Sequence, residues 1–336
     1  MTTQCSADVV ICTYTEARWT MLLRSVSSVL AQSVVPDKVI VVVDHNSELA
    51  AKCRDQWCAG VTDPLVPVVV VENRFAGRLG SARNTGLLLA TADIVAFLDD
   101  DAEAADDWLE RLLAVYRQDP SAVAVGGAPL PNYAVPRPSW FPSQFDWIFG
   151  CHYRLMPTEL APVRHLIGAS MSVVRESMLD VRGFHADDHD DMDLSHRILH
   201  AHGRSALLYE PLARVHHYVP PERLAWDYFW RRCFYVNRGK VAAVAGLGDA
   251  GNLRAELRFA ARTLIDFGPA SLAAITGETV RLRQWFVAMA GTVLAGLGYL
   301  AGKVQVSRGV APDRRTTGLA VEDIARARAK IRVGDA

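Results

Sequence analysis

Three consecutive carboxylates, Asp99, Asp100 and Asp101, form the most chemically distinctive group in the sequence. Adjacent negative charges repel one another unless a cation or a set of hydrogen-bond donors holds them. Carboxylate oxygens suit Mg²⁺ and Mn²⁺, and such ions are commonly shared with the phosphates of a substrate. One aspartate could instead cap the following helix, but a cap accounts for only one of the three. We therefore interpret this group as a divalent-metal site.

A second acidic run, Asp187 to Asp193, contains five aspartates around His189. Leu194, Ile198 and Leu199 follow at helical spacing, which places the run at a helix N-terminus. The helix dipole stabilises one or two carboxylates at that position, but five exceed what capping needs. A carboxylate fixed there, near a bound sugar phosphate, could serve as a general base.

Histidines and arginines elsewhere in the chain could complete such a site. His216 and His217 lie downstream of both acidic groups and are candidate metal ligands, although a lone histidine is usually structural. Asp44, at the end of a predicted strand, could accept a hydrogen bond from a nucleotide base. Arg78 or Arg83 could pair with a diphosphate, which guanidinium groups recognise well. Asp44 and both arginines could equally be helix caps or members of surface ion pairs.

The elements that must position these groups alternate between strands and helices. Residues 94–98 are five apolar residues that include β-branched and aromatic side chains, which predicts a strand buried on both faces. The three carboxylates then emerge at the carboxyl edge of a sheet, where open α/β sheets bind ligands. Five alternations predict a parallel sheet with right-handed crossovers over about residues 1–127. The strands predicted in this part are 9–12, 39–43, 66–71, 94–98 and 123–125. Two further strands are predicted, one at 165–174 and one that ends at 209–211.

Composition and absent motifs narrow the function. No Gly-x-Gly-x-x-Gly follows the first strand and no Gly-Lys-Ser/Thr phosphate loop occurs, so a nucleotide would be held by other groups. With 36 basic and 37 acidic residues, the chain is not a nucleic-acid binder steered by net charge. The six cysteines lack metal-site spacing and no signal peptide is visible. We therefore expect a cytoplasmic globular protein with reduced thiols.

Two stretches beyond residue 128 could contact an acceptor. Residues 129–162 are rich in proline and aromatic residues and predict a long loop, in which Trp140 could stack on a sugar. A long loop equally needs aromatic anchors to stay folded. Gly168 lies among small residues where the backbone can approach a ligand.

The last third of the chain predicts a helical extension. Arg254, Arg258 and Arg262 recur every fourth residue beside apolar residues, which indicates a basic amphipathic helix. Residues 285–301 form an uncharged apolar run of 17 residues, near the lower limit for crossing a bilayer, where about 20 are typical. A helix packed on the catalytic domain, an interfacial helix and a full span are all open. We favour peripheral membrane contact, because basic amphipathic and apolar helices together favour an anionic surface.

Together these pieces resemble glycosyltransferase family 2, an inverting family with the GT-A fold. The similarity spans about residues 8–240 and comprises six motifs in the family's order. Residues 13–16 are similar to the opening Thr-Tyr-Asn-Glu turn, 44–47 to Asp-Asp-Gly-Ser, and 77–86 to the Gly-Ala-Arg-Asn-x-Gly helix start. Residues 99–101 match Asp-x-Asp, 190–191 stand at Glu-Asp, and 215–220 are similar to the late segment with a metal-ligand histidine.

The resemblance implies a role for each matched position and a GT-A fold with a mixed, mainly parallel sheet flanked by helices. Asp191 would be the catalytic base, and Asp101 with His217 would hold Mn²⁺ or Mg²⁺. The acceptor-side candidates are Trp140, Gly168 and Asp190. The residues expected to bind the nucleotide sugar are Thr13, Glu16, Asp44, Arg78, Arg83, Asp99 and Asp100.

Three departures from the family pattern bear on this expectation. Asp190 replaces a glutamate, so the side chain is shorter but keeps its negative charge. His45-Asn46 replaces Asp-Gly, so the base contact can differ in detail. The Gln-x-x-Arg-Trp signature of processive polysaccharide synthases is absent, which favours transfer of a single sugar.

The expected function is inverting transfer of one sugar from a nucleotide-diphosphate sugar, with a UDP-sugar favoured, to a carbohydrate or lipid-linked acceptor such as a cell-envelope glycan. We expect a nucleotide-sugar-binding half at 1–127, an acceptor-binding and catalytic half at 128–240, and an extension at 241–336 that contacts the inner face of the membrane. A sugar-phosphate nucleotidyltransferase is an alternative, but residues 13–18 lack the Gly-rich basic loop that it would need. A non-catalytic sugar-binding protein on the same fold is the other alternative, and the intact acidic motifs argue against it.

Overall fold

The computed structural model describes residues 5–59, 65–185, 189–243, 254–266, 279–309 and 318–334. The chain divides into two compact units. The first unit comprises residues 1–129, 158–217 and 314–336, and the second comprises 130–157 and 218–313. The functional division expected from the sequence, with boundaries after residues 127 and 240, stays a prediction.

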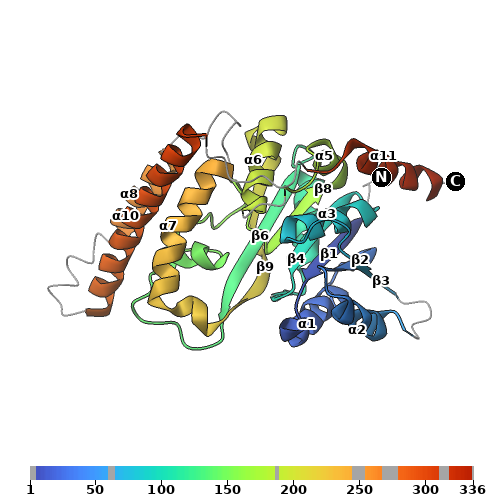
Figure 1. Cartoon of the computed structure of the whole chain (residues 1–336), viewed down its shortest axis with the longest axis horizontal. Helices are drawn as coiled ribbons and strands as arrows, with labels where there is room; N and C mark the ends of the chain where they lie inside the picture. Colours follow the sequence, from blue (N-terminus) through green and yellow to red (C-terminus); the bar gives the residue numbers. More distant parts are fainter. Residues whose placement is uncertain are drawn as a thin grey trace. The chain divides into compact units, whose positions relative to one another are not determined.

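One mixed sheet organises the chain, with strand order β3-β2-β1-β4-β8-β6-β9-β5 and β7 paired to β9 (Figure 1). Strands β1 to β4 are parallel, whereas β8 is antiparallel to β4 and β6 is antiparallel to β8. The expected α/β architecture with a mixed sheet and flanking helices is confirmed. The strands are Ala7–Thr13 (β1), Lys38–Val43 (β2), Val68–Glu72 (β3), Ile94–Asp99 (β4), Ala102–Ala104 (β5), Ala124–Tyr133 (β6), Ala161–Pro162 (β7), Ser170–Val174 (β8) and Leu207–Val219 (β9).

Helices cover both faces of the sheet in the first unit. They are Trp19–Leu30 (α1), Ser47–Trp57 (α2), Leu79–Leu89 (α3), Trp108–Gln118 (α4), Arg175–Asp180 (α5), Asp190–His202 (α6) and Val321–Gly334 (α11).

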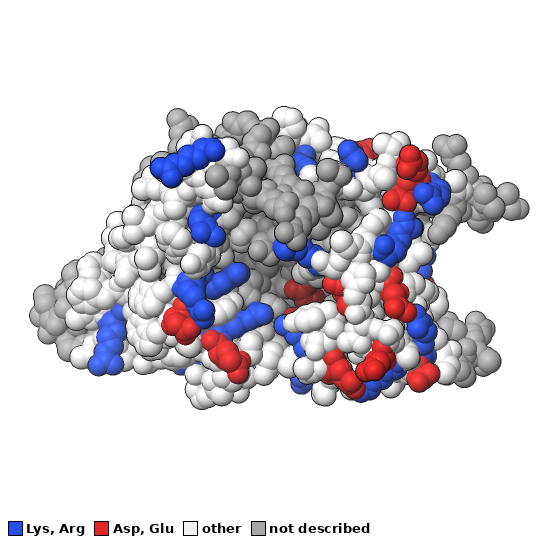
Figure 2. Space-filling view, viewed as in Figure 1, with Lys and Arg blue, Asp and Glu red and all other residues white. Residues whose placement is uncertain are grey.

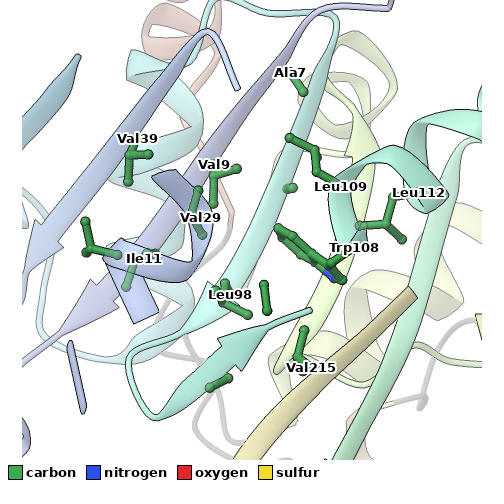
Figure 3. Close-up of a cluster of buried hydrophobic side chains, with 14 of the residues drawn as sticks. Ala7, Val9, Ile11, Val29, Val39, Leu98, Trp108, Leu109, Leu112 and Val215 are labelled. Atoms are coloured by element: carbon green, nitrogen blue, oxygen red, sulfur yellow. The ribbon is translucent and has the colours of Figure 1, made fainter. Parts of the chain in front are cut away.

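The sheet is buried on both faces because successive strand residues point to opposite sides. On β1, Val9 and Ile11 join the core under α1, α2 and α4, whereas Val10 and Cys12 join the core under α3, α5, α6 and α11. Figure 3 shows the first of these cores, with Trp108 of α4 among the strand side chains. Because both faces of the sheet are covered, the strand sequences are continuous hydrophobic runs and do not alternate between apolar and polar residues.

Several strand predictions need correction. The strand predicted at 123–125 exists as β6, but it is antiparallel and does not extend the parallel set. The strand predicted at 165–174 begins only at Ser170, because Gly168 belongs to the turn before it. The strand expected to end at 209–211 continues through β9 to Val219. Each error arose where the partner strand is distant in sequence, so that local pattern carried no information on pairing.

In the described part of the second unit the regular elements are helices, together with the last residues of β6 and β9. Its aromatic core includes Phe141, Phe145 and Phe229, with Val287 and Ala288 packed among them. The apolar run predicted at 285–301 lies within α10, which among the described residues is the helix long and apolar enough to cross a membrane. The helices are Trp226–Ala243 (α7), Arg254–Asp266 (α8) and Thr279–Ser307 (α10), with a 3₁₀ helix at Ser143–Phe149.

Candidate functional site

Asp99, Asp101 and His217 converge at the carboxyl edge of the sheet in the first unit. Their candidate ligand atoms all lie within 4.8 Å of one another. Asp99 ends β4, and the chain then turns back as β5, where Ala102 pairs with His217 of β9. This pairing brings His217 Nε2 to 3.2 Å from Asp101 Oδ1. Two carboxylates and one imidazole at this separation form a donor set that fits a divalent cation such as Mn²⁺.

Arg18 holds the other side of the same acidic group. Its Nη1 donates to Asp100 Oδ1 at 2.8 Å and lies 3.1 Å from Asp101 Oδ2. Burial raises the pKa of Asp100 to about 6, and the Asp101 charge adds to this rise, whereas Arg18 opposes it. Arg18 was not among the site residues predicted from the sequence. Its place just beyond β1, the neighbour of β4, is the signal that could have identified it.

Arg83, on α3, joins the metal-candidate group to the second acidic run. Its Nη2 donates to Asp99 Oδ1 and to the Gly168 carbonyl, both at 2.9 Å, and its Nη1 donates to Asp190 Oδ2 at 3.0 Å. Burial lowers the pKa of this guanidinium, but Asp190 and Asp99 together raise it above its ordinary value. Arg83 is therefore a permanent cation with protein partners at both terminal nitrogens.

The second acidic run begins α6, as the sequence predicted, and its carboxylates face the Gly168 turn. The Gly168 N–H donates to Asp191 Oδ2 at 3.0 Å. A Cβ at Gly168 would lie 3.0 Å from Arg83 Nη2 and 3.2 Å from Asp191 Oδ2, so a side chain there would displace both. Burial raises the pKa of Asp190 to about 6; Arg83 lowers it and the Asp191 charge adds to the rise. Asp187 and Asp188 lie outside the described residues.

Asp44 belongs to a neighbouring group at the end of β2. Its Oδ1 accepts a hydrogen bond from Asn73 Nδ2 at 2.7 Å. Asn73 is buried after β3 and also accepts from Thr85 Oγ1 at 2.8 Å, so it fixes α3 against the strand ends. A Cβ at Gly77 would lie 3.4 Å from Asp44 Oδ2, which shows how closely the loop before α3 passes this carboxylate. Asn73 was not among the site residues predicted from the sequence.

The remaining predicted residues are more scattered. Thr13 is buried at the end of β1 beside Asp100. Glu16 is exposed and forms an ion pair with Lys52. Arg78 is exposed just before α3, where its carbonyl accepts from Ser81 Oγ at 2.8 Å. Trp140 lies in the second unit and stacks on Trp226 with ring centroids 3.7 Å apart.

The first unit thus contains one connected network that joins residues from both acidic groups. The individual roles expected for them stay predictions, as do those of Asp44, Glu16, Arg78 and Trp140. The network's members are Arg18, Arg83, Asp99, Asp100, Asp101, Gly168, Asp190, Asp191 and His217.

Comparison of the sequence with known proteins finds similarity to glycosyltransferases. The model of the family described as "Glycosyl transferase family 2" matches residues 8–182. A glucosyl-dolichyl phosphate glucuronosyltransferase of Haloferax volcanii is 34% identical over 243 residues, which cover 69% of this chain and 75% of that protein. A pre-mycofactocin glycosyltransferase of Mycobacterium tuberculosis is 28% identical, and the similarity covers 61% of this chain but 42% of that protein.

Solved structures give the same fold. A mannosyltransferase from Pyrobaculum calidifontis, in complex with GDP-Man and Mn²⁺, matches with a TM-score of 0.58 and 20% identity over 90% of this chain and 87% of that one. GalNAc-T7 with UDP, GalNAc and Mn²⁺ matches with a TM-score of 0.50 and 18% identity over 76% of this chain and 54% of that one. Both neighbours are glycosyltransferases, and at these identities the likeness establishes the fold alone.

Proposed function

We propose that this chain, which belongs to glycosyltransferase family 2, moves a single sugar from a nucleotide-diphosphate sugar to an acceptor hydroxyl with the aid of a divalent cation. The family model matches more than half of the chain, so the protein is a transferase enzyme. The observation that carries the finer proposal is the convergence of Asp99, Asp101 and His217, linked through Arg83 to Asp190 beside Asp191. Carboxylates gathered for ion coordination next to a candidate base are what metal-assisted transfer requires.

Asp99, Asp101 and His217 would hold the cation, for which we propose Mn²⁺ or Mg²⁺. When bound, the ion supplies positive charge that neutralises the departing nucleotide diphosphate. Arg18 already neutralises part of the charge on Asp100 and Asp101. The protein thereby keeps three adjacent aspartates in place before a substrate arrives, and this preorganisation reduces the reorganisation needed during the reaction.

Asp191 is our candidate for the general base. Its carboxylate would take the proton of the acceptor hydroxyl while that oxygen forms a bond to the anomeric carbon. The bond from that carbon to the diphosphate oxygen breaks, and its electron pair leaves with the nucleotide. The Gly168 N–H orients Asp191 Oδ2, and Arg83 holds the Gly168 carbonyl. Attack opposite the leaving group inverts the anomeric configuration, which proton NMR of the product would test.

For the substrates, we propose a UDP-sugar donor and a lipid-linked acceptor. Support for the acceptor comes from the relative at 34% identity, whose name gives glucosyl-dolichyl phosphate as its substrate. Asp44 is our candidate for the nucleotide base contact, because it lies at the end of β2 with one oxygen held by Asn73. For the location, we propose the cytoplasm, at the inner face of the membrane, where the protein would reach such an acceptor.

Calorimetric titration with UDP, GDP and dTDP, each with and without Mn²⁺, tests the donor and the metal together. We expect Mn²⁺-dependent binding of UDP by the wild type and its loss in Asp101→Asn, because that change removes one ionic ligand but keeps the side-chain size. Asp107→Asn, at a half-exposed carboxylate paired with Arg111, is the matched control and should bind as the wild type does. Equal UDP affinity in Asp101→Asn and wild type would refute the metal assignment.

A further inference from the structure

One side of α10 in the second unit carries a continuous apolar stripe. We define the stripe as Phe286, Val293, Leu297, Leu300 and Val304, which are 48–61% exposed. Successive members are three, four or seven residues apart, so they share one face of the helix. We propose that this stripe docks in the plane of an anionic lipid bilayer and holds the protein at the membrane surface.

The opposite face of α10 packs closely against α7. A Cβ at Gly298 would overlap the Phe234 carbonyl oxygen, and one at Gly302 would lie 2.6 Å from the Arg238 carbonyl oxygen. Glycines at these positions let the two helix backbones approach closely. Rotating α10 to bury the stripe would therefore break this packing, so the stripe is the face that remains for a partner.

The charges around the stripe match an anionic surface. The sequence of α10 contains Arg281, Arg283 and Lys303 but no aspartate or glutamate. Arg258 and Arg262 of α8 are exposed in the same unit. In Figure 2 the surface over α10 is mostly uncharged, with Lys and Arg near its two ends. An apolar face with basic residues beside it is the composition that binds anionic lipid at the interface.

The neighbouring helix argues against a full span. Glycines 291 and 298 of α10 face Phe229 and Phe234 of α7, so Arg231 lies alongside the middle of the apolar run. Arg231 pairs with Asp227 at 2.6 Å, and both side chains are about two-thirds exposed. If α10 crossed the bilayer, this exposed ion pair would have to enter hydrocarbon, which is unfavourable. Docking in the plane lets α10 meet lipid while α7 keeps its charges in water.

A second copy of the chain is the competing occupant, because spacings of three and four residues also occur in coiled coils. Coiled-coil seams carry opposite charges at their flanking positions, which pair across the interface. On α10 the flanking Met289 and Leu294 are apolar and pack against the aromatic core, and the helix has basic residues with no acidic ones. Two such helices would repel each other. Lipid therefore fits this face better than another copy does.

Vesicle co-sedimentation of the full chain tests the proposal, and it needs neither donor nor acceptor, so its outcome is separate from that of the proposed function. We expect binding to phosphatidylcholine vesicles that contain phosphatidylglycerol, and at least a tenfold weaker partition in the double variant Leu297→Asn, Leu300→Asn. Both side chains are exposed, so folding should be unaffected, which circular dichroism checks. Leu65→Asn, at a leucine 89% exposed in the first unit, is the matched control and should partition as the wild type does.

Three results would overturn this inference. Equal partition of the double variant and the control would show that the stripe is not the lipid contact. Failure of alkaline carbonate to release the bound protein would indicate a span and not in-plane docking. Absence of vesicle binding, together with a dimer in solution that the double variant dissociates, would assign the stripe to a second copy.

Discussion

The two units of the molecule bury their side chains in different ways. At the sheet edge of the first unit, Asp100 and Asp190 are buried carboxylates held by Arg18 and Arg83. The core of the second unit is a cluster of stacked and edge-on aromatic rings, and its helices meet through glycines. The first arrangement depends on charge and the second depends on shape.

This difference indicates where chemistry takes place. Buried ion pairs contribute little net stability, because the desolvation of both partners offsets their attraction. A network such as that around Arg83 is therefore better explained by a reaction that needs fixed charges than by folding. The aromatic and glycine contacts of the second unit need no such explanation, since close packing alone stabilises them. The feature for which we propose a function in that unit is the surface that its packing leaves exposed.

The helix contact in the second unit gives the larger of two stability predictions. In Gly298→Ala the added Cβ overlaps the Phe234 carbonyl oxygen, so α7 and α10 must separate. We expect the free energy of unfolding to fall by about 1–3 kcal/mol. In the control Gly296→Ala, the added Cβ meets no described atom within 4 Å. This control should gain roughly 0.5–1 kcal/mol from better helix propensity.

Urea unfolding monitored by tryptophan fluorescence would measure both variants. Equal effects of the two substitutions would contradict the conclusion that shape holds this unit together. The tryptophans of the second unit are Trp140, Trp147, Trp226, Trp230 and Trp285.

A smaller effect on the free energy of unfolding is expected from the titration of Asp146. This residue is a buried carboxylate in the second unit, comparable to the buried carboxylates of the first. Burial raises the pKa of Asp146 to about 6; Arg137 and the Tyr133 hydroxyl lower it in part. In the unfolded chain the pKa is about 3.9. Between these values the folded protein holds a proton that the unfolded chain has released. The free energy of unfolding should therefore fall by about 1–2 kcal/mol as pH rises from about 4 to 6, and level off above that.

The variant Asp146→Asn has no carboxyl proton to titrate and should lose this part of the pH dependence. Comparing its urea unfolding with that of the wild type at each pH isolates Asp146 from Asp100 and Asp190, whose pKa values are also raised to about 6. Parallel pH profiles for the two proteins would show that Asp146 titrates alike in the folded and unfolded states.

Local pattern predicted much of the fold and the acidic parts of the site. The apolar run of β4 followed by three aspartates gave the correct strand and sheet edge, because both signals lie in adjacent residues. The paired histidines and the second acidic run were candidates from the sequence pattern, and the family resemblance selected His217 and Asp191 among them. The contact of His217 with Asp101 depends on the pairing of β5 with β9, more than 100 residues apart. No local rule specifies that pairing.

Arg18, Asn73 and the role of Gly168 could not be predicted for the same reason. Arg18 lies 82 residues from Asp100, and Asn73 lies 29 residues from Asp44. Gly168 was noted as a small residue, but its N–H contact with Asp191 depends on the turn before β8. Each of these contacts depends on which strand ends lie next to one another, and only the assembled sheet determines that arrangement.

The measurement that tests the central claim most directly compares sugar transfer and donor binding in Asp191→Asn. Removing the candidate base while keeping its size should reduce transfer by about 10²–10⁴-fold. UDP binding in the presence of Mn²⁺ should stay at the wild-type level, because Asp99, Asp101 and His217 are unchanged. The control Asp107→Asn should retain both sugar transfer and UDP binding. Transfer by Asp191→Asn at the wild-type rate would contradict the account, because the proton would then have another acceptor.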